Sequence, residues 1–463
     1  MRRELYLFAA ALLFVSGNLT AGYICDRTAG TPGSLAAAAI VLTCITASVV
    51  IMVSSRKLQV SRLLFFPLLG ATGAATHDFF RPGPETSILQ ESRSATLTGI
   101  ISEGGRSSSG KPFLEVELGP EKTIIYNIPE DMEWTPGDTL AATGLRCSRV
   151  ENFTPDFDYR RWMEKRTVFF TCLCNSSTKL TIKTSDRTPL RCLPARLRKG
   201  FSEAVDSALQ GKDMADTRAV VKALAYGYQD EIPEEIEDSF RQSGAIHLLA
   251  LSGMHLGLLY GILSWLLRAA GNSIAVRKIK SVVIISVLWA FTIFTGCGVS
   301  ILRAAVMFTV YEAGALAGRD RSGINSMSIS AIIITVADPD APSGISFQLS
   351  YAAMTAIFLI YPHLHSLIPV RRKIFRSITD LCSMTVACQI TTAPIIYLHF
   401  GTFAFFSLLA NLLCSPLITV VMALIPCAFA APWFGGGTVS SITWAISFLI
   451  KTFIDINTVI SHL

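Results

Sequence analysis

Long apolar runs recur along most of this chain, and they constrain its fold more than any other feature. Only 16% of the 463 residues are charged, whereas about 25% is typical of soluble domains. Since a helix needs about 20 apolar residues to cross a bilayer, the runs predict a polytopic α-helical membrane protein with about 10–11 transmembrane helices. The runs lie near residues 5–21, 34–53, 63–76, 245–267, 281–295, 301–317, 324–337, 347–361, 378–398, 403–431 and 439–460.

Basic residues are concentrated in every second loop between these runs. They precede the first run and follow the second, fourth, sixth and eighth runs. The intervening loops are neutral, mixed or acidic, as in "ADPDAPSG" at residues 337–344. Because Lys and Arg are enriched in cytoplasmic loops, the pattern predicts a cytoplasmic N-terminus and an extracytoplasmic location for the long polar segment after the third run.

The polar segment begins with pieces that alternate apolar and polar residues. Examples are "KPFLEVELG" at residues 111–119 and "KTIIYNIPE" at residues 122–130, each bounded by turn-forming residues. Such short strands predict a small β-barrel of the OB type. We therefore expect four parts: N-terminal transmembrane helices at 1–80, an OB-like domain at 81–190, an amphipathic helical connector at 191–243, and a transmembrane bundle at 244–463.

Four of the 11 cysteines lie in the polar segment: Cys147, Cys172, Cys174 and Cys192. An extracytoplasmic location permits one or two disulfides there, but the sequence leaves the pairing open. The chain has no C-x-x-C pair with metal-binding spacing, no Walker loop and no convincing catalytic triad. We therefore expect no metal site, no cofactor and no enzyme activity in this chain.

Long motifs in the second half of the chain resemble one family. They include "LAYGYQDEIPEEIEDSFRQSGAIHLLALSGMHLGLLYG", "TGCGVSILRAAVMFTVYEAGALAGR", "ADPDAPSGISFQLSYAAMTAIFLIYP" and "ACQITTAPIIYLHFGTFAFFSLLANLLCSPL". These resemble signatures of the ComEC-type competence proteins, the inner-membrane DNA-uptake channels of transformable bacteria. The segment "TPGDTLAATGLRCSRVENFTPDFDYRRWMEKRTVFFT" is similar to the extracytoplasmic OB-like domain of that family.

The resemblance implies a channel in the bacterial cytoplasmic membrane that translocates single-stranded DNA during natural transformation. Its implied partners are single-stranded DNA, the lipid bilayer, a periplasmic DNA receptor, a separate nuclease, and a cytoplasmic motor or single-strand-binding protein. Many family members carry a C-terminal metallo-β-lactamase-like domain. This sequence ends at Leu463 without one, so we do not expect the nuclease chemistry here.

Polar residues inside the apolar runs are the candidates for a DNA path, because such groups are costly in lipid and usually face a protein interior or a watery path. The place of Arg303 in a motif that resembles the family implies an inward-facing cation that meets phosphates, a role for which a guanidinium is suited, although snorkelling to the interface is the alternative. His247 and His255 would lie about 80° apart on a straight helix, unless Ser252 and Gly253 break it; hydrogen bonding between helices is their alternative role. The full set is His247, Ser252, His255, Arg303, Gln348, Ser350 and Asn411.

In the OB-like domain, single-strand binding needs cations that follow the phosphates and aromatic rings that stack on bases. Residues of these types are Lys111, Phe113, Tyr126, Arg146 and Arg149. Most aromatic residues of a small barrel belong to its core, so each one alone is more simply structural. We interpret "FDYRRWM" at residues 157–163 as an element that closes the domain rather than as a binding site.

Two other functions are compatible with the same residues. The first is a transporter of another polyanion or of a small solute on this scaffold. The second is an intramembrane hydrolase with Ser252 as nucleophile and a histidine as base, although the Gly-x-Ser-x-Gly elbow is absent. A wide cationic lining would favour DNA over a small solute.

Overall fold

The computed structural model describes a defined part of the chain, and all structural statements below concern that part. Its described residues group into two compact units. One falls within Pro82–Pro233 together with Ile293–Gly296, and the other within Glu234–Thr292 and Cys297–Leu463. The described residues are 15, 89, 91–106, 111–129, 131–152, 159–184, 189–211, 214–271, 273–318, 321–338, 340–367, 373–401, 406–430 and 436–462.

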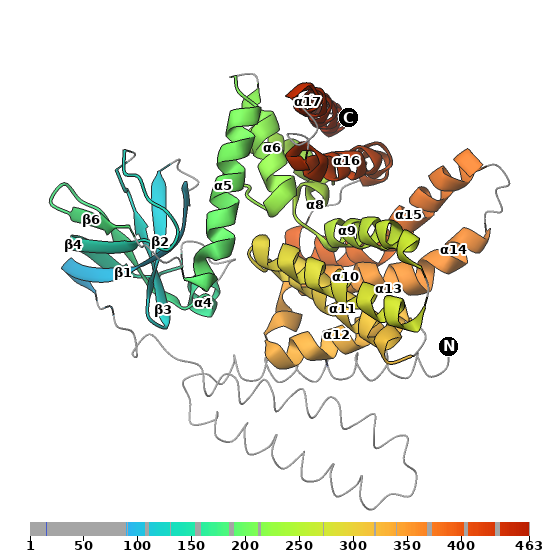
Figure 1. The fold of residues 1–463 in the computed structure, drawn as a ribbon, viewed down its shortest axis with the longest axis horizontal. Coiled ribbons are helices and arrows are strands. Elements are labelled where there is room, and N and C mark those ends of the chain that lie inside the picture. Colours follow the sequence, from blue (N-terminus) through green and yellow to red (C-terminus); the bar gives the residue numbers. More distant parts are fainter. Residues whose placement is uncertain are drawn as a thin grey trace, which may run out of the picture. The chain divides into compact units, whose positions relative to one another are not determined.

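The first unit contains a closed β-barrel (Figure 1). The strands pair in the order β1-β2-β3-β5-β4, and β1 also pairs with β4, which closes the barrel. All pairings are antiparallel except that of β3 with β5, and β6 is added to β4 outside the closure. This barrel is consistent with the expected OB type. The strands are β1 (Ser92–Arg106), β2 (Pro112–Leu118), β3 (Glu121–Tyr126), β4 (Thr139–Arg149), β5 (Val168–Leu173) and β6 (Lys179–Lys183).

Alternation along the strands separates the barrel core from its outer face. Leu114, Ile125, Cys172 and Cys147 stand at one level on β2, β3, β5 and β4, and all are fully buried in the core. Gly99 on β1 has a steric role, since a Cβ there would lie 2.5 Å from the carbonyl oxygen of Glu117. Because successive side chains of a strand point to opposite faces, one set of alternate residues fills the barrel core and the other set lies on the outer face.

A second, smaller core lies on the outer face of the barrel. Helix α4 (Tyr159–Lys165) contributes the fully buried Met163, which packs with Ile124, Val150 and Val168. Helix α4 thus covers part of the outer wall, as its interpretation as a closing element implies. The unit continues with α5 (Leu193–Ala208) and α6 (Ala215–Tyr226).

A buried lysine holds these two helices to the turn that follows them. Lys222 on α6 is 2% exposed, and its Nζ lies 2.9 Å from the carboxylate of Asp206 on α5 and 2.8 Å from that of Glu231. A buried charge requires such partners. The segment 191–243 that we expected to form one connector is divided between the two units at residue 233.

The second unit is helical. Each of the apolar runs expected after residue 244 contains at least one helix. Helices α13 and α14 are joined without interruption by a π-helical turn (Ala356–Ile360). The helices are α7 (Glu234–Gln242), α8 (Ile246–Leu249), α9 (Gly253–Leu266), α10 (Ile274–Phe294), α11 (Val299–Leu316), α12 (Gly323–Ala337), α13 (Ile345–Thr355), α14 (Tyr361–Leu367), α15 (Lys373–Phe400), α16 (Ser407–Ala430) and α17 (Gly436–Ser461).

Five helical stretches of the described residues are long and apolar enough to cross a membrane. They are Val299–Leu316, Ile345–Leu367, Arg376–Phe400, Ser407–Ala428 and Ser441–Ser461. Helix α12 is apolar but has only 15 residues. The apolar runs expected near residues 5–21, 34–53 and 63–76 lie outside the described residues, apart from Val15. The fold is that of a multi-pass membrane protein with a small β-barrel.

Glycines allow α9 to approach α11 closely. A Cβ on Gly253 would lie 3.4 Å from the Cβ of Ala304, and a Cβ on Gly257 would lie 3.8 Å from the ring of Phe308. Small residues four apart are a common means of helix packing in membranes. The close approach fixes α9 against the helix that carries Arg303.

Candidate nucleic-acid surface and membrane path

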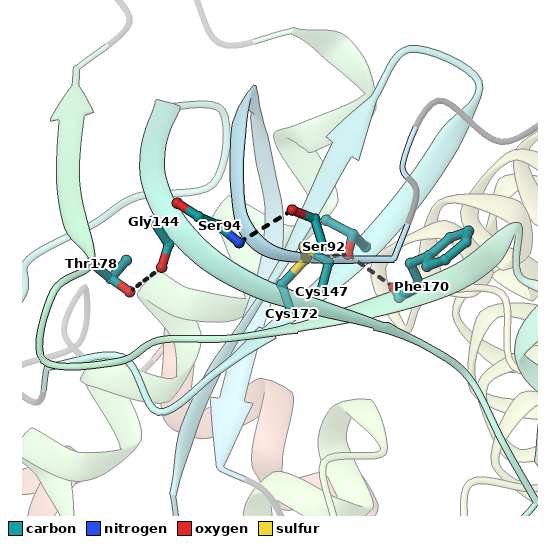
Figure 2. Close-up of a disulfide and its surroundings, with 8 residues drawn as sticks. Ser92, Ser94, Gly144, Cys147, Phe170, Cys172 and Thr178 are labelled. Atoms are coloured by element: carbon teal, nitrogen blue, oxygen red, sulfur yellow. Dashed lines mark hydrogen bonds between the residues drawn. A yellow bond between two sulfur atoms is a disulfide. The ribbon is translucent and has the colours of Figure 1, made fainter.

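The barrel is cross-linked between two neighbouring strands. Figure 2 shows the disulfide between Cys147 on β4 and Cys172 on β5, residues that are paired directly across the two strands. Thr123 on β3 donates a hydrogen bond from its hydroxyl to the carbonyl of Phe170 next to this cross-link, at 2.9 Å. One of the disulfides that the sequence permitted is therefore present, while Cys174 and Cys192 are free.

A row of outward-facing side chains crosses four strands one residue away from the disulfide level. The register pairs Phe113 with Tyr126, Tyr126 with Leu173, and Leu173 with Arg146. Three of the five residues expected to bind DNA in this domain are thus brought to one level. The rings of Phe113 and Tyr126 lie 6.0 Å apart, and both are partly buried in the small outer core.

Helix α4 extends this row with an exposed aromatic side chain. Trp162 is 43% exposed, and its ring stacks on Tyr159 with a centroid distance of 5.8 Å. The guanidinium of Arg166 lies 5.0 Å from the centre of the Trp162 ring. Burial, followed by the neighbouring Tyr159, raises the pKa of Tyr126 well above its usual range, so this phenol stays neutral. The cluster Tyr126, Tyr159, Trp162 and Arg166 forms an aromatic platform with a cation on its surface.

The charges around the platform are partly neutralised. Glu115 accepts from Lys122 at 2.7 Å and from Arg166 at 3.3 Å. Lys111 and Arg146 are exposed and have no carboxylate partner among the described residues. Arg149 is only partly exposed, and its Nε is buried without a hydrogen-bond partner in the described part of the chain. Lys111 and Arg146 are thus the cations of this face that are free to contact a phosphate.

His247 and His255 do not lie on one straight helix. The chain forms α8, an extended turn at Ala250–Ser252, and then α9, so the two histidines lie on different helices. The angle of about 80° holds only for a straight helix and does not apply here, whereas the break at Ser252 and Gly253 is confirmed. His247 is exposed, and its Nδ1 lies 3.0 Å from the carbonyl oxygen of Gly244.

His255 has a defined structural role at the start of α9. The backbone N–H of Ser252 donates to Nδ1 of His255 at 3.2 Å, and the Ser252 hydroxyl accepts from the N–H of Met254 at 3.3 Å. This is a capping box with histidine in the position usually taken by Glu or Gln. Because Nδ1 of His255 accepts a hydrogen bond, the proton of the neutral ring is on Nε2. That nitrogen is buried and has no hydrogen-bond partner among the described residues.

A cavity of about 320 Å³ lies beside this cap. Its lining is mostly apolar, with His255 and Thr419 as the polar exceptions. The Ser252 hydroxyl and the His255 ring lie 3.2 Å apart, but their other contacts are those of a helix cap. The remaining lining residues are Met254, Gly257, Leu258, Ile418 and Met422.

Arg303 is enclosed by the helices rather than open to a wide passage. It is 4% exposed, and its Nη2 donates to the hydroxyl of Ser346 at 2.9 Å. Its Nε and Nη1 are buried and have no hydrogen-bond partner among the described residues. A guanidinium remains charged in proteins, so the bundle contains a buried cation with little compensation.

The other expected path residues are dispersed. Gln348 donates to the carbonyl oxygens of Pro342 and Ser343, at 3.2 and 3.4 Å, and so closes the turn before α13. Ser350 and Asn411 are partly exposed, and Oδ1 of Asn411 lacks a hydrogen-bond partner in the described structure. Helix α8, which carries His247, contacts α16, which carries Asn411. In the ranges that the structure describes, no group of three His, Cys, Asp or Glu side chains is arranged to hold a metal ion.

Two features of the site were missed in the sequence. Trp162 lies in "FDYRRWM", for which the sequence predicts only a closing role, although a tryptophan about one helical turn from a basic residue is itself a signal of a stacking site. Glu312 is a fully buried carboxylate in α11 that accepts from Tyr260 on α9 and Ser281 on α10, at 2.7 and 2.5 Å. An ionisable residue inside an apolar run should have been noted by the same rule that selected Arg303.

These observations define the class of the protein: a multi-pass membrane protein whose helical unit accompanies a closed β-barrel. A family model described as "Competence protein" matches residues 224–463, which is more than half of the chain. The chain belongs to the ComEC-type competence protein family.

Curated relatives agree with this assignment. The chain is 26% identical over 285 residues to ComE operon protein 3 of Bacillus subtilis. This alignment covers 61% of this chain and 34% of that protein. It is 25% identical over 277 residues to Recombination protein 2 of Haemophilus influenzae, covering 58% of this chain and 33% of the relative. An uncharacterized Escherichia coli protein, YcaI, is 26% identical over 207 residues, an alignment that covers 44% of this chain and 28% of YcaI. The matches thus span about a third of these relatives, and no solved structure matches the chain.

Proposed function

We propose that this protein is a membrane channel that moves single-stranded DNA across the bacterial cytoplasmic membrane during natural transformation. The observation that carries the proposal is the platform on the barrel, in a chain of the competence family. Single-strand binding requires stacking rings beside cations. OB folds bind oligonucleotides on their second and third strands and on the connection between the fourth and fifth strands. In this chain those elements carry Phe113, Tyr126 and Trp162, respectively.

In this proposal the barrel lies outside the membrane and the N-terminus lies in the cytoplasm. Two independent features support that orientation. The loops between apolar runs are basic in alternation, and the basic side of a membrane protein is usually cytoplasmic. The barrel contains the Cys147–Cys172 disulfide, and disulfides persist in oxidising compartments.

In this proposal the DNA path runs through the helical unit. It passes the polar residues carried by α8, α9, α11, α13 and α16. Four members of the set have an exposed ring or unpartnered buried atoms, namely His247, His255, Arg303 and Asn411. The burial of Arg303 means that the bundle must open for a strand to pass. A DNA receptor outside the membrane, a separate nuclease, and a cytoplasmic motor or single-strand-binding protein would supply capture, strand removal and energy.

DNA binding by the purified full chain in lipid nanodiscs tests the platform. The ligand is a fluorescein-labelled oligothymidylate of about 16 nucleotides, the upper site size for one OB fold. Loss of one stacking ring costs about 1–3 kcal/mol per base, so Trp162→Ala should weaken binding about 5- to 150-fold. Trp265→Ala is the matched control, because Trp265 is 66% exposed but lies on α9. Equal binding by wild type and Trp162→Ala would remove the platform from the proposal.

Transformation in the native host tests the channel itself. A clean deletion should abolish uptake of purified homologous DNA, and DNA should accumulate outside the cytoplasmic membrane. Wild-type complementation should restore uptake, and Trp162→Ala should restore it only partly. If the deletion strain transforms normally and no second copy compensates, the DNA channel fails. The search should then turn to another polyanion, a small solute or the hydrolase.

A further inference from the structure

We propose that Arg303 is the centre of a built anion site for a single phosphate diester group, formed where the first turns of α11 and α13 meet. The inference deepens the proposed function and rests on it for the identity of the substrate. Arg303 lies in the second turn of α11, and Ser346 lies in the first turn of α13. The 2.9 Å hydrogen bond from Nη2 of Arg303 to the Ser346 hydroxyl joins the two helix beginnings.

Both helices begin without a side-chain cap. The N-cap residues are Gly298 for α11 and Gly344 for α13, and neither makes a side-chain cap hydrogen bond because glycine has no side chain. The first N–H groups of a helix need acceptors, and an uncapped N-terminus carries partial positive charge. Two such ends beside one guanidinium make this region electropositive.

The guanidinium itself is the independent sign of a ligand. Arg303 is buried, with only 4% of its surface exposed. Its Nε and Nη1 nevertheless have no hydrogen-bond partner among the described residues. Burying a charge without partners is expensive, and buried N–H groups are nearly always bonded. Nε and one Nη together form the fork that binds a phosphate through two parallel hydrogen bonds. Ser346 occupies only Nη2.

The surroundings of Arg303 favour an anion with a single negative charge. Ser346 is exposed, so the site borders the surface of the described helices. Close by on α13, the Tyr351 hydroxyl pairs with Ser330 of α12 at 3.0 Å, and the ring of Tyr351 packs on Phe347. No carboxylate lies within ion-pair distance of Arg303 in the part of the chain that the structure covers. A phosphate diester, with one negative charge, matches one guanidinium.

Phosphate diesters could come from the DNA backbone or from a lipid headgroup. Under the proposed topology, α11 and α13 both begin at the outer side of the membrane. The positive ends would then face incoming DNA, and each passing phosphate would compensate the cation in turn.

Thermal unfolding of the full chain in maltoside micelles, which contain no phosphate diester, tests the site with dimethyl phosphate as the probe. Wild type should be stabilised by this anion in a saturable manner. Arg303→Gln should weaken the apparent affinity at least about tenfold, since hydrogen bonds to charged groups are each worth about 1.5–3 kcal/mol. Arg303→Lys should retain part of the effect, as a cation without the fork. The neutral compound trimethyl phosphate should have no effect on any variant.

Stability without an anion separates a ligand site from a structural arginine. Removing an uncompensated buried cation should raise the melting temperature of Arg303→Gln above wild type in anion-free buffer. A purely structural arginine would instead lower it. Loss of stability together with an unchanged response to dimethyl phosphate would overturn the inference.

Two further arms identify the source of the phosphate. Discs with anionic phosphatidylglycerol should leave the response to dimethyl phosphate intact if DNA is the ligand, and should remove it if the headgroup already fills the site. Transformation by Arg303→Gln then separates the two proposals. If dimethyl phosphate binds at Arg303 but transformation does not require this chain, the anion site stands and the DNA channel fails. If the chain is required but the probe never binds at Arg303, only the present inference fails.

Discussion

The guanidinium of Arg321 lies 2.7 Å from the carboxylate of Glu312, although Glu312 is fully buried and the Arg321 side chain is 43% exposed. Arg321 follows α11 and pairs with a residue inside that helix. Tyr260 and Ser281 donate to the same carboxylate from α9 and α10. One buried anion thus holds three helices and a loop together.

Arg321→Ala should destabilise the protein, because it leaves the buried carboxylate with two neutral donors only. Breaking a fully buried pair costs about 3–5 kcal/mol, and we expect a smaller loss of about 1–3 kcal/mol because Arg321 is half exposed. Thermal unfolding in nanodiscs measures the effect. Lys278→Ala, which removes an exposed cation without an ion pair in the described structure, should be neutral. In the double variant Glu312→Gln/Arg321→Ala, most of the loss should disappear, and additive losses would contradict the pairing.

The Cys147–Cys172 disulfide should be present in the protein isolated from cells. Blocking free thiols before and after reduction, followed by peptide mass spectrometry, should place these two cysteines in the protected pool. Cys147→Ser/Cys172→Ser should lower barrel stability by about 3 kcal/mol, as expected for a loop of 25 residues. Cys174→Ser is the control and should leave the cross-link intact. Alkylation of Cys147 before reduction would show that the barrel lies in a reducing compartment.

The thiol of Cys174 should react slowly at neutral pH. Burial raises its pKa to about 11, and only the thiolate is an effective nucleophile. Its alkylation rate, followed by peptide mapping of the folded chain, should rise about tenfold per pH unit up to about pH 11. The raised pKa also means that the folded state holds this proton more tightly than the unfolded state does. Stability should therefore fall as pH rises from about 9 to about 11, and Cys174→Ser should lessen that fall.

Gly323→Ala should disturb the junction between α12 and the π-helical turn. A Cβ at Gly323 would lie closer to the ring of Phe358 than real contacts allow. We expect a loss of about 1–3 kcal/mol from overpacking, measured by thermal unfolding. Gly314→Ala on α11 is the matched control, because a Cβ there meets nothing within 4 Å and alanine favours a helix. Gly323→Ala with wild-type stability would show that Phe358 moves aside easily.

Periodicity predicted most of the fold. Alternation of two residues placed the strands that contain Phe113 and Tyr126, and the apolar runs after residue 244 became helices. Both follow from local geometry, in which side chains repeat every 2 or 3.6 residues. The break at Ser252 and Gly253 was also predictable, since serine is a preferred N-cap.

The remaining features depend on which residues meet across elements. The sequence could not pair Cys147 with Cys172, because that requires the register of β4 on β5. It could not show that Arg303 is enclosed, because the enclosure depends on α13 lying against α11. It could not show that His255 caps α9, because the cap depends on a side-chain conformation that brings Nδ1 to the Ser252 backbone. Tertiary contacts decided each of these cases.

Strand β6 pairs with β4 outside the barrel closure, so within the described sheet its other side is an edge. An open edge invites pairing with a second chain, and proteins commonly protect such edges with lysine. Lys179 and Lys183 are the first and last residues of β6, and both are exposed. The short strand, with a lysine at each end, therefore protects the domain against pairing with the edge of a second copy.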